Sequence, residues 1–533
     1  MHIQRKKIVL AVSLALSLSQ QSAFAQFEPS FELSGINGQN GVTINGIGAG
    51  DSSGTSVSTV GDVNGDGIDD LIIGALTADS GSNMYSGSSY VVFGTVSGLP
   101  NPFNLEDING LNGFTINGAS SSDLSGRSVS NAGDVNGDGT DDLIIGASSA
   151  SPNGNSGAGA SYLVFGSDTG LPNPLNLDSL NGVNGIIING IAANDNSGTS
   201  VSSAGDINDD GFDDVIIGAP FADPSNNLVA GSSYVVFGAA SGIPNPFNLD
   251  EINGLNGFTI NGAAAGDQSG ISVSGAGDIN GDGIDDVIIG ANLSNSSAGS
   301  SYVVFGTTSG FPNPLKLEDI NGINGFSING VTNGDQSGTS VSAAGDVNGD
   351  GTDDLIIGAY LADSSGGNDM GSSYVVFGTD SGLPNPFDLD DINGLNGFII
   401  NGESAGDYSG LSVHSAGDMN GDGIDDLIIG APLAGLNNND YSGSSYVIFG
   451  STSQFSNPFN LIGLNGSNGF AINGVAENDL SGVSVSEAGD FNSDGIGDVI
   501  IGARAATPGG NAGAGSSYVV FGKEKPIFKD GFD

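Results

Sequence analysis

The stretch SGTSVSTVGDVNGDGIDDLIIGA, residues Ser53 to Ala75, decides the fold because close copies of it recur along the whole chain. The first Asp of its acidic segment returns at Asp62, Asp134, Asp206, Asp278, Asp346, Asp418 and Asp490. The successive spacings are 72, 72, 72, 68, 72 and 72 residues. Seven copies at a nearly constant interval indicate seven structural repeats of about 70 residues each.

Each repeat contains four short segments rich in Val, Ile, Phe and Tyr, typified by GFTING, SGTSVSTVG, DLIIGA and YVVFG. Gly, Asn, Asp and Ser bound these segments, which is typical of strands joined by tight turns, and no segment has a helical period. The repeats therefore predict an all-β fold, a seven-bladed β-propeller of four-stranded antiparallel blades. The near-continuous apolar runs DLIIGA and YVVFG are expected to form the core between neighbouring blades.

The two ends of the repeat region predict how the ring closes. The chain enters with a GFTING copy at Gly41 to Gly46 and leaves after a YVVFG copy at Tyr518 to Gly522. The last repeat therefore lacks its GFTING strand. We expect the N-terminal strand to complete the seventh blade, which would leave no unpaired sheet edge between blades.

Composition excludes several classes of function. The 533 residues include 60 Asp plus Glu against 9 Lys plus Arg, a formal net charge of -51. Such a chain offers no basic surface for nucleic acid or for an anionic membrane. There is no Cys, and the only histidines are His2 and His414, so disulfides, thiolate chemistry and a histidine-rich zinc site are not expected.

The first residues predict export from the cell. Arg5, Lys6 and Lys7 precede an apolar run from Ile8 to Leu18 and a small-residue site at Ala23 to Ala25. This order is typical of a secretory signal peptide, here residues 1–25. We expect a propeller at 26–522, a C-terminal tail at 523–533, no transmembrane segment, and a monomer that is secreted or held at the cell surface, in the extracellular or periplasmic space.

The acidic segment predicts a calcium site in every repeat. In the first copy, side-chain oxygens stand at positions 1, 3, 5 and 9 as Asp62, Asn64, Asp66 and Asp70, with the Ile68 carbonyl at position 7. Hard oxygen ligands at this spacing favour Ca²⁺. The segment differs from an EF-hand because position 12 is Ile and strands flank it. Metal-free Asx turns are the alternative, although their crowded carboxylates would repel one another.

The seven copies predict up to seven bound calcium ions. The predicted ligands are Asp62, Asn64, Asp66, Ile68, Asp70, Asp134, Asn136, Asp138, Thr140, Asp142, Asp206, Asn208, Asp210, Phe212, Asp214, Asp278, Asn280, Asp282, Ile284, Asp286, Asp346, Asn348, Asp350, Thr352, Asp354, Asp418, Asn420, Asp422, Ile424, Asp426, Asp490, Asn492, Asp494, Ile496 and Asp498. We expect the calcium to be mainly structural, since a protein without disulfides would gain roughly 1.4 to 2.7 kcal/mol per occupied site.

The repeats resemble the FG-GAP repeats of the integrin α-subunit head. The similarity is carried by Ser53 to Ala75 and its six later copies, although the Phe-Gly of the family is Ser-Gly here. Gly-Ala-Pro is complete only at Gly218 to Pro220 and at Gly430 to Pro432. The resemblance implies a seven-bladed, calcium-loaded binding head of the kind used in adhesion, and secreted bacterial proteins with such repeats look similar.

The loops between the second and third strands are the expected binding loops, because they vary while the scaffold repeats. Aromatic and Arg side chains are favoured anchors, which gives five candidate contacts: Tyr85, Phe221, Tyr360, Tyr441 and Arg504. On the same face an Asp-x-Ser-Gly motif recurs, and we interpret its Asp as a turn cap. These aspartates are Asp51, Asp123, Asp195, Asp267, Asp335, Asp407 and Asp479.

The sequence thus predicts a calcium-binding module that recognises an extracellular protein or glycan, with no catalytic residues and no enzymatic activity. His414 replaces a strand Ser and lacks a catalytic neighbour in the sequence. Two alternatives stay open. One is a calcium-dependent extracellular enzyme acting on polysaccharide or on a lipid anchor, and the other is a passive structural surface protein.

Overall fold

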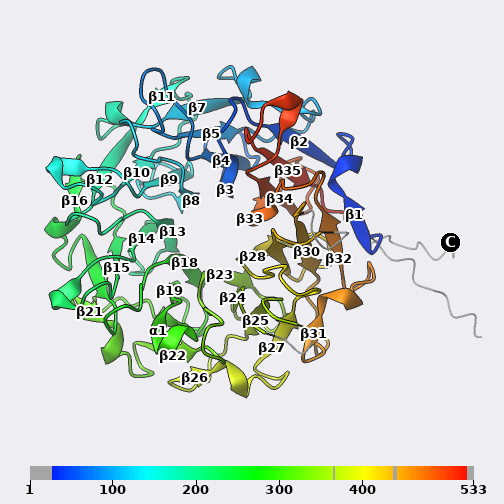
Figure 1. Ribbon diagram of the computed structural model, residues 1–533. Coiled ribbons are helices and arrows are strands. Elements are labelled where there is room, and N and C mark those ends of the chain that lie inside the picture. The colour runs from blue at the N-terminus through cyan, green and yellow to red at the C-terminus, as the bar shows by residue number, and fades with distance from the viewer. Residues whose placement is uncertain (1–26, 364–366, 436–440, 525–533) are drawn as a thin grey trace, which may run out of the picture.

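The computed structural model describes residues 27–363, 367–435 and 441–524. The predicted signal peptide and tail residues 525–533 lie outside these ranges. Seven sheets surround a central opening as the blades of a propeller (Figure 1). The predicted all-β, seven-bladed architecture is therefore confirmed. The described part of the chain also contains one four-residue α-helix, α1 (Ser294–Ser297), and ten 3-10 helices of three residues each.

Each sheet has five strands rather than the four that we predicted. In the first blade, β3 (Ser53–Gly61) is innermost, followed outward by β4 (Asp70–Ala75), β5 (Ser88–Val92) and β7 (Gly113–Asn117), all antiparallel. The fifth, β11 (Leu175–Asn176), comes from the next repeat and runs parallel to β7. A strand of two residues is too short to show a period in sequence, which is why the prediction missed it.

The other six blades repeat this order. Their innermost strands are β8 (Ser128–Gly133), β13 (Ser200–Gly205), β18 (Ser272–Gly277), β23 (Ser340–Gly345), β28 (Ser412–Gly417) and β33 (Ser481–Gly489). The second strands are β9 (Asp142–Ala147), β14 (Asp214–Ala219), β19 (Asp286–Ala291), β24 (Asp354–Ala359), β29 (Asp426–Ala431) and β34 (Asp498–Ala503). The third strands are β10 (Ala160–Val164), β15 (Ser232–Val236), β20 (Ser300–Val304), β25 (Ser372–Val376), β30 (Ser444–Ile448) and β35 (Ser516–Val520).

The outer strands of these blades are shared between repeats. The fourth strands are β12 (Gly185–Asn189), β17 (Gly257–Asn261), β22 (Gly325–Asn329), β27 (Gly397–Asn401), β32 (Gly469–Asn473) and β2 (Gly41–Asn45). The fifth strands are β16 (Phe247–Asn248), β21 (Leu315–Lys316), β26 (Phe387–Asp388), β31 (Phe459–Asn460), β1 (Ser30–Glu32) and β6 (Phe103–Asn104). Every repeat therefore contributes backbone to its neighbours.

The N-terminal segment closes the ring through two blades. As predicted, β2 pairs antiparallel with β35 and completes the seventh blade, with Gly41 opposite Val520. In addition, β1 pairs parallel with β32 as the fifth strand of the sixth blade. Phe27 stacks on Phe470 with ring centroids 4.4 Å apart. The same segment therefore fastens two successive blades.

The core lies between blades and is built by the predicted runs. All six residues of β4 are buried, and Ile72 packs against Leu143 and Ile145 of the second blade. Position 74 in this strand requires Gly, because a Cβ there would lie 2.2 Å from the Gly126 carbonyl oxygen of the next blade. The Ile residues of the IIGA motif therefore supply the buried apolar surface, and its Gly allows neighbouring blades to pack closely.

Hydrogen bonds between innermost strands link all seven blades in a ring. The first Ser of each SVS-like motif accepts a hydrogen bond from the Val backbone N–H of the next blade, at 3.0 to 3.1 Å. The donor and acceptor pairs are Val57 and Ser484, Val129 and Ser56, Val201 and Ser128, Val273 and Ser200, Val341 and Ser272, Val413 and Ser340, and Val485 and Ser412. The ring explains why this Ser recurs in every repeat.

Candidate functional site

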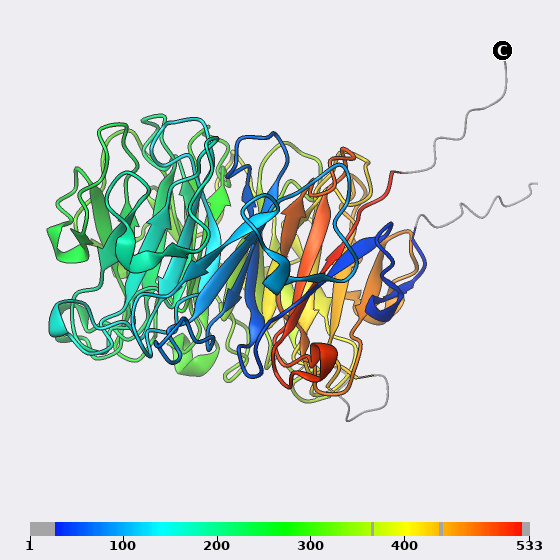
Figure 2. The same cartoon turned by 90° about the horizontal axis from the view of Figure 1, so that it is seen from above.

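The blades present two different sets of loops. The loops between first and second strands, residues 62–69 in the first blade, lie at one end, and we call this the acidic-loop face. The loops between second and third strands, residues 76–87 in the first blade, lie at the other end, the variable-loop face. In Figure 2 the variable loops, with α1, lie along the lower edge of the molecule.

The acidic loops are folded around their first Asp. Asp62 Oδ1 accepts hydrogen bonds from the backbone N–H groups of Gly65 and Asp66 at 2.7 and 2.9 Å, and Asp62 Oδ2 accepts one from Gly67 at 2.7 Å. The Asn64 amide donates to Asp70 Oδ2 at 2.9 Å. The side chains at positions 3 and 9 are therefore in contact, whereas the position 1 carboxylate is held by the backbone of its own loop.

The carboxylate at position 9 is buried, and no Lys or Arg among the described residues forms an ion pair with it. Burial raises the pKa of Asp70 to about 8, and the nearby negative charges of Asp66 and Asp62 raise it further, against hydrogen bonds from Gly94 and Asn64. The pKa values of Asp142, Asp214, Asp286, Asp354 and Asp498 are also raised to about 8, and that of Asp426 well above its usual range, by burial first in each case. Each loop therefore favours a bound proton or a bound cation.

The seventh loop contains two buried side-chain oxygen atoms that accept no hydrogen bond from any described residue. Asn492 Oδ1 and Asp498 Oδ2 are buried and have no hydrogen-bond partner in the part of the chain that the structure describes. They occupy positions 3 and 9, and both are hard oxygen donors, which fit Ca²⁺. Within the described ranges no three Asp, Glu or His side chains converge on one metal position. A cation would therefore also depend on the amide and carbonyl oxygens of the loop.

Neighbouring acidic loops are joined by a contact that the sequence reading missed. The Asp at position 8 of one loop accepts a hydrogen bond from the position 1 N–H of the preceding loop, at 2.7 to 3.0 Å. The acceptors are Asp141, Asp213, Asp285, Asp353, Asp425 and Asp69. The seventh loop has Gly497 at this position and therefore lacks the carboxylate. At its junction with the sixth loop, Glu487 Oε2 would lie 3.8 Å from a Cβ on Gly417. Burial raises the pKa of Glu487.

All five predicted contact residues lie on the variable-loop face. The side chains of Tyr85, Phe221 and Tyr441 are exposed to 50%, 37% and 41%, and Arg504 is exposed as well. Tyr360 is different because it is half-buried: its ring packs edge-on against Tyr408 at 5.4 Å. Its hydroxyl donates to Gln336 Oε1 at 3.1 Å. Tyr360 therefore contributes to local packing, whereas the other four side chains are exposed to solvent.

The Asp-x-Ser-Gly motif caps a turn at this face, as the sequence indicated. Asp51 Oδ2 accepts a hydrogen bond from the Gly48 N–H at 2.8 Å, and the later copies repeat this contact. Burial raises the pKa of Asp123 and of Asp407 to about 6. The residue x was missed by sequence reasoning although its variation inside a constant motif was visible.

Residue x adopts a left-handed backbone conformation in all seven repeats, with φ from 54° to 58°. These residues are Ser52, Leu124, Asn196, Gln268, Gln336, Tyr408 and Leu480. None is Gly, so each holds a strained conformation that costs about 1 to 3 kcal/mol, and such strain is concentrated at functional sites. The motif therefore fixes the backbone while the presented side chain changes.

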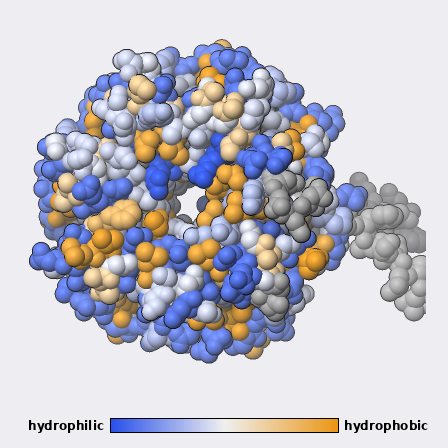
Figure 3. Space-filling view, in the orientation of Figure 1, coloured by the Kyte–Doolittle hydropathy of each residue, from blue (hydrophilic) through white to orange (hydrophobic). Residues whose placement is uncertain are grey.

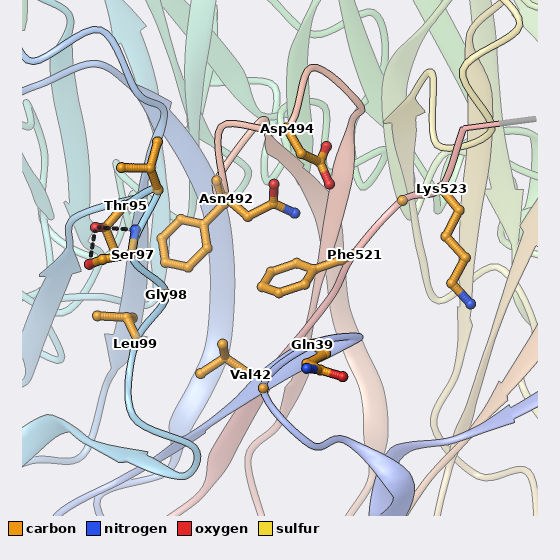
Figure 4. A pocket seen from close by; sticks show the side chains of 14 residues that line it. Gln39, Val42, Thr95, Ser97, Gly98, Leu99, Asn492, Asp494, Phe521 and Lys523 are labelled. Atoms are coloured by element: carbon orange, nitrogen blue, oxygen red, sulfur yellow. Dashed lines mark hydrogen bonds between the residues drawn. The ribbon is translucent and has the colours of Figure 1, made fainter.

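Hollows occur on both faces. A hollow of about 310 Å³ lies at the closure seam between the seventh and first blades, with Val42, Leu99 and Phe521 as its apolar side (Figure 4). Asn492 and Asp494 of the seventh acidic loop form its polar rim. On the variable-loop face, a hollow of about 480 Å³ is lined by Asp123 and Tyr162 together with small polar residues.

The sequence analysis predicted no catalytic residues and no transmembrane segment. His414 lies on innermost strand β28, with Nδ1 3.1 Å from the Ser415 carbonyl oxygen. In the described ranges, no helix combines the length and the apolar character needed to cross a membrane.

The FG-GAP repeat family matches the chain seven times, at residues 53–92, 125–164, 197–236, 269–304, 337–376, 409–448 and 482–520. These segments cover more than half of the 533 residues. Each segment runs from the innermost strand through the acidic loop to the third strand of one blade. The matched unit is thus the part of each blade that carries both candidate faces.

Several characterised proteins are similar over part of the chain. Integrin alpha pat-2 of Caenorhabditis elegans is 32% identical over 197 residues, which cover 35% of this chain and 14% of that protein. Integrin alpha-5 of Xenopus laevis is 30% identical over 185 residues, 34% of this chain and 15% of that protein. Phosphatidylinositol-glycan-specific phospholipase D of Rattus norvegicus is 39% identical over 112 residues, which cover 21% of this chain and 13% of that protein. The match therefore spans a small part of each relative.

Proposed function

The chain belongs to the FG-GAP repeat family and is similar to integrin alpha subunits, and from this premise we propose that it is a calcium-stabilised module that binds an extracellular protein or glycan. The observation that carries the proposal is the difference between the two faces. The acidic loops repeat and bond to one another. On the opposite face the Asp-x-Ser-Gly turns keep one backbone conformation while residue x changes, and the loops between second and third strands differ in sequence.

Calcium has a scaffold role in this proposal. It would bind Asp62, Asn64, Asp66, the Ile68 carbonyl and Asp70, and the equivalent residues of the other six loops, which supply only oxygen donors. A divalent cation would neutralise the buried position 9 carboxylates, whose pKa values are raised by burial and by neighbouring Asp side chains. It would also hold in place the loops whose position 8 aspartates join the blades.

Ligand recognition is assigned to the variable-loop face. Exposed Tyr and Phe side chains are effective anchors because they bury a large apolar area at little entropic cost. Tyr85, Phe221 and Tyr441 meet this description. The predicted signal peptide supports an extracellular setting, in which binding of this kind would serve adhesion.

The alternative is an extracellular enzyme, and the relatives named phospholipase D keep it open because they share this repeat. The match covers 13% of the rat enzyme, so the similarity carries only the repeat segment. A single experiment separates the two functions. Purified full-length mature protein is applied to immobilised matrix proteins and glycans in millimolar calcium and in EGTA, while released products are measured in the same wells.

Saturable, calcium-dependent retention without product is the expected result. Product release from a glycan or from a lipid-anchored protein would replace the binding function with an enzymatic one. Absence of both retention and product across the panel would contradict the proposal and would favour a structural surface protein.

A further inference from the structure

The two arginines of the propeller lie near each other in the fold, although they are far apart in sequence. After residue 26 the chain contains no Arg besides Arg127 and Arg504. Partial desolvation of the Arg127 guanidinium lowers its pKa, although the side chain reaches solvent, and the positive charge of Arg504 lowers it further. Two like charges close enough to act on each other are unexpected in a chain with a formal net charge of -51.

The fold explains how they meet. Arg504 directly follows β34 of the seventh blade, and Arg127 directly precedes β8 of the second blade. Both strands lie against β3 of the first blade, and a Cβ on Gly54 would be 3.2 Å from the Ala503 backbone nitrogen. Both arginines therefore stand at the variable-loop end of β3. Figure 3 views this face and shows strongly hydrophilic surface beside the central opening, where Figure 1 places β3 and β8.

No carboxylate neutralises this pair. Among the described residues, neither Arg forms an ion pair or hydrogen bond, and the single ion pair found there joins Lys316 to Glu318 at 3.4 Å. Both Arg side chains are exposed to solvent. In other repeats the position of Arg127 is held by Thr, Ile, Leu or Val, so the blade itself does not require a positive charge there.

We propose that Arg127 and Arg504 form an anion-binding site at the variable-loop mouth of the central opening, and that this site takes a single carboxylate or sulfate group. Guanidinium groups bind such oxyanions through paired, charge-assisted hydrogen bonds. The acidic protein around the pair repels extended polyanions, so the site selects one isolated anionic group. We take the bound anionic group to be part of the ligand, so this assignment rests on the proposed binding function.

The site is tested with sodium sulfate and, separately, with sodium acetate as probes, at constant ionic strength set by sodium chloride. Binding to the full mature chain is followed by isothermal titration calorimetry. Saturable binding of one anion is expected, with affinity reduced about tenfold or more in Arg127→Gln and in Arg504→Gln. Lys316→Gln makes the same change of charge at an exposed site and is expected to bind like the unchanged protein. The stronger probe identifies the anionic group.

Arg127→Lys separates geometry from charge, and we expect it to bind more weakly than the unchanged protein because the paired donors are lost. Thermal melts without sulfate are expected to show Arg127→Gln and Arg504→Gln at least as stable as the unchanged protein, since like charges are removed. Absence of saturable binding, or equal affinity in both Gln variants and Lys316→Gln, would overturn the site. Anion binding with no ligand retained on the panel would instead contradict the proposed function alone.

Discussion

The two faces of the propeller use the same seven repeats in opposite ways. On the acidic-loop face, the residues at positions 1, 3, 5 and 9 are the same in every repeat, and six of the seven loops carry the Asp that bonds to the preceding loop. On the variable-loop face, the Asp-x-Ser-Gly backbone is constant and the presented side chains differ. The difference indicates that one face maintains the ring and the other is free to specialise.

Cation removal should produce the largest effect on this comparison. We expect EGTA to lower the melting temperature by about 10 to 20 °C, because seven sites at roughly 1.4 to 2.7 kcal/mol each are lost from a chain whose unfolding entropy is about 1 kcal/mol per degree. Calorimetry in calcium and in EGTA measures this change. An unchanged melt would show that the acidic loops hold the ring without metal.

A single loop gives a smaller and sharper test. We expect Asp142→Asn to lower the melting temperature by about 1 to 3 °C in calcium, through loss of one site. In EGTA at pH 8.5 the same substitution should instead raise the melting temperature, because Asn removes a buried, uncompensated carboxylate. Tyr85→Ser on the other face serves as the control and should leave both melts unchanged. The same destabilisation by Asp142→Asn in both buffers would reject the cation role of this loop.

The junction of the sixth and seventh blades tests the hydrogen bonds between loops. Gly497 has no positive φ, so Asp can replace it without backbone strain. We expect Glu487→Ser with Gly497→Asp to restore the missing contact and to add about 1 kcal/mol, or about 1 °C. Gly497→Asp alone should gain less because Glu487 would lie beside the new carboxylate. A double variant no more stable than Glu487→Ser would show that this contact adds nothing.

The smallest effect concerns the turn caps of the variable-loop face. The pKa of Asp123 is about 6 in the folded protein and 3.8 without the fold, so the folded state binds the proton more tightly. Protonation therefore stabilises the protein at pH 4, and this contribution is lost as the pH rises from about 4 to about 6. Asp123→Asn keeps an acceptor for the Ser120 N–H and cannot ionise.

We expect melting curves of Asp123→Asn, recorded in calcium, to match the unchanged protein at pH 4 and to exceed it by under about 1 kcal/mol at pH 7, after allowance for solvent screening. Ser120→Ala leaves the carboxyl group in place and serves as the control. A difference between Asp123→Asn and the unchanged protein that does not vary with pH would argue against a raised pKa at this cap.

The sequence was sufficient for the repeated parts of the fold. The spacing of Asp62 and its copies predicted seven blades, and the missing strand after Gly522 predicted closure by Gly41 to Asn45. The fifth strands were missed because segments of two or three residues are too short to show a period. The role of Asp141 was missed because its partner, the Asp62 N–H, is a backbone group in another repeat.

The individual parts of the site were harder to predict. Tyr360 was expected to be a free contact, and only the structure shows its packing on Tyr408. Arg127 and Arg504 meet because closure brings the seventh blade beside the first, so no spacing in sequence connects them. Repetition therefore predicts the scaffold, whereas contacts made once in the molecule require the three-dimensional arrangement.

The most direct test of the account compares the two faces on one bound ligand. Two matched variants each replace two exposed apolar side chains with Ser: Tyr85 and Phe221 on the variable-loop face, and Leu111 and Val183 at the acidic-loop end of the outer strands. Affinity for the ligand retained on the panel is measured in calcium. The account predicts a loss of about tenfold or more for the first variant and no change for the second. Equal affinity of the two variants, or loss in the second alone, would contradict it.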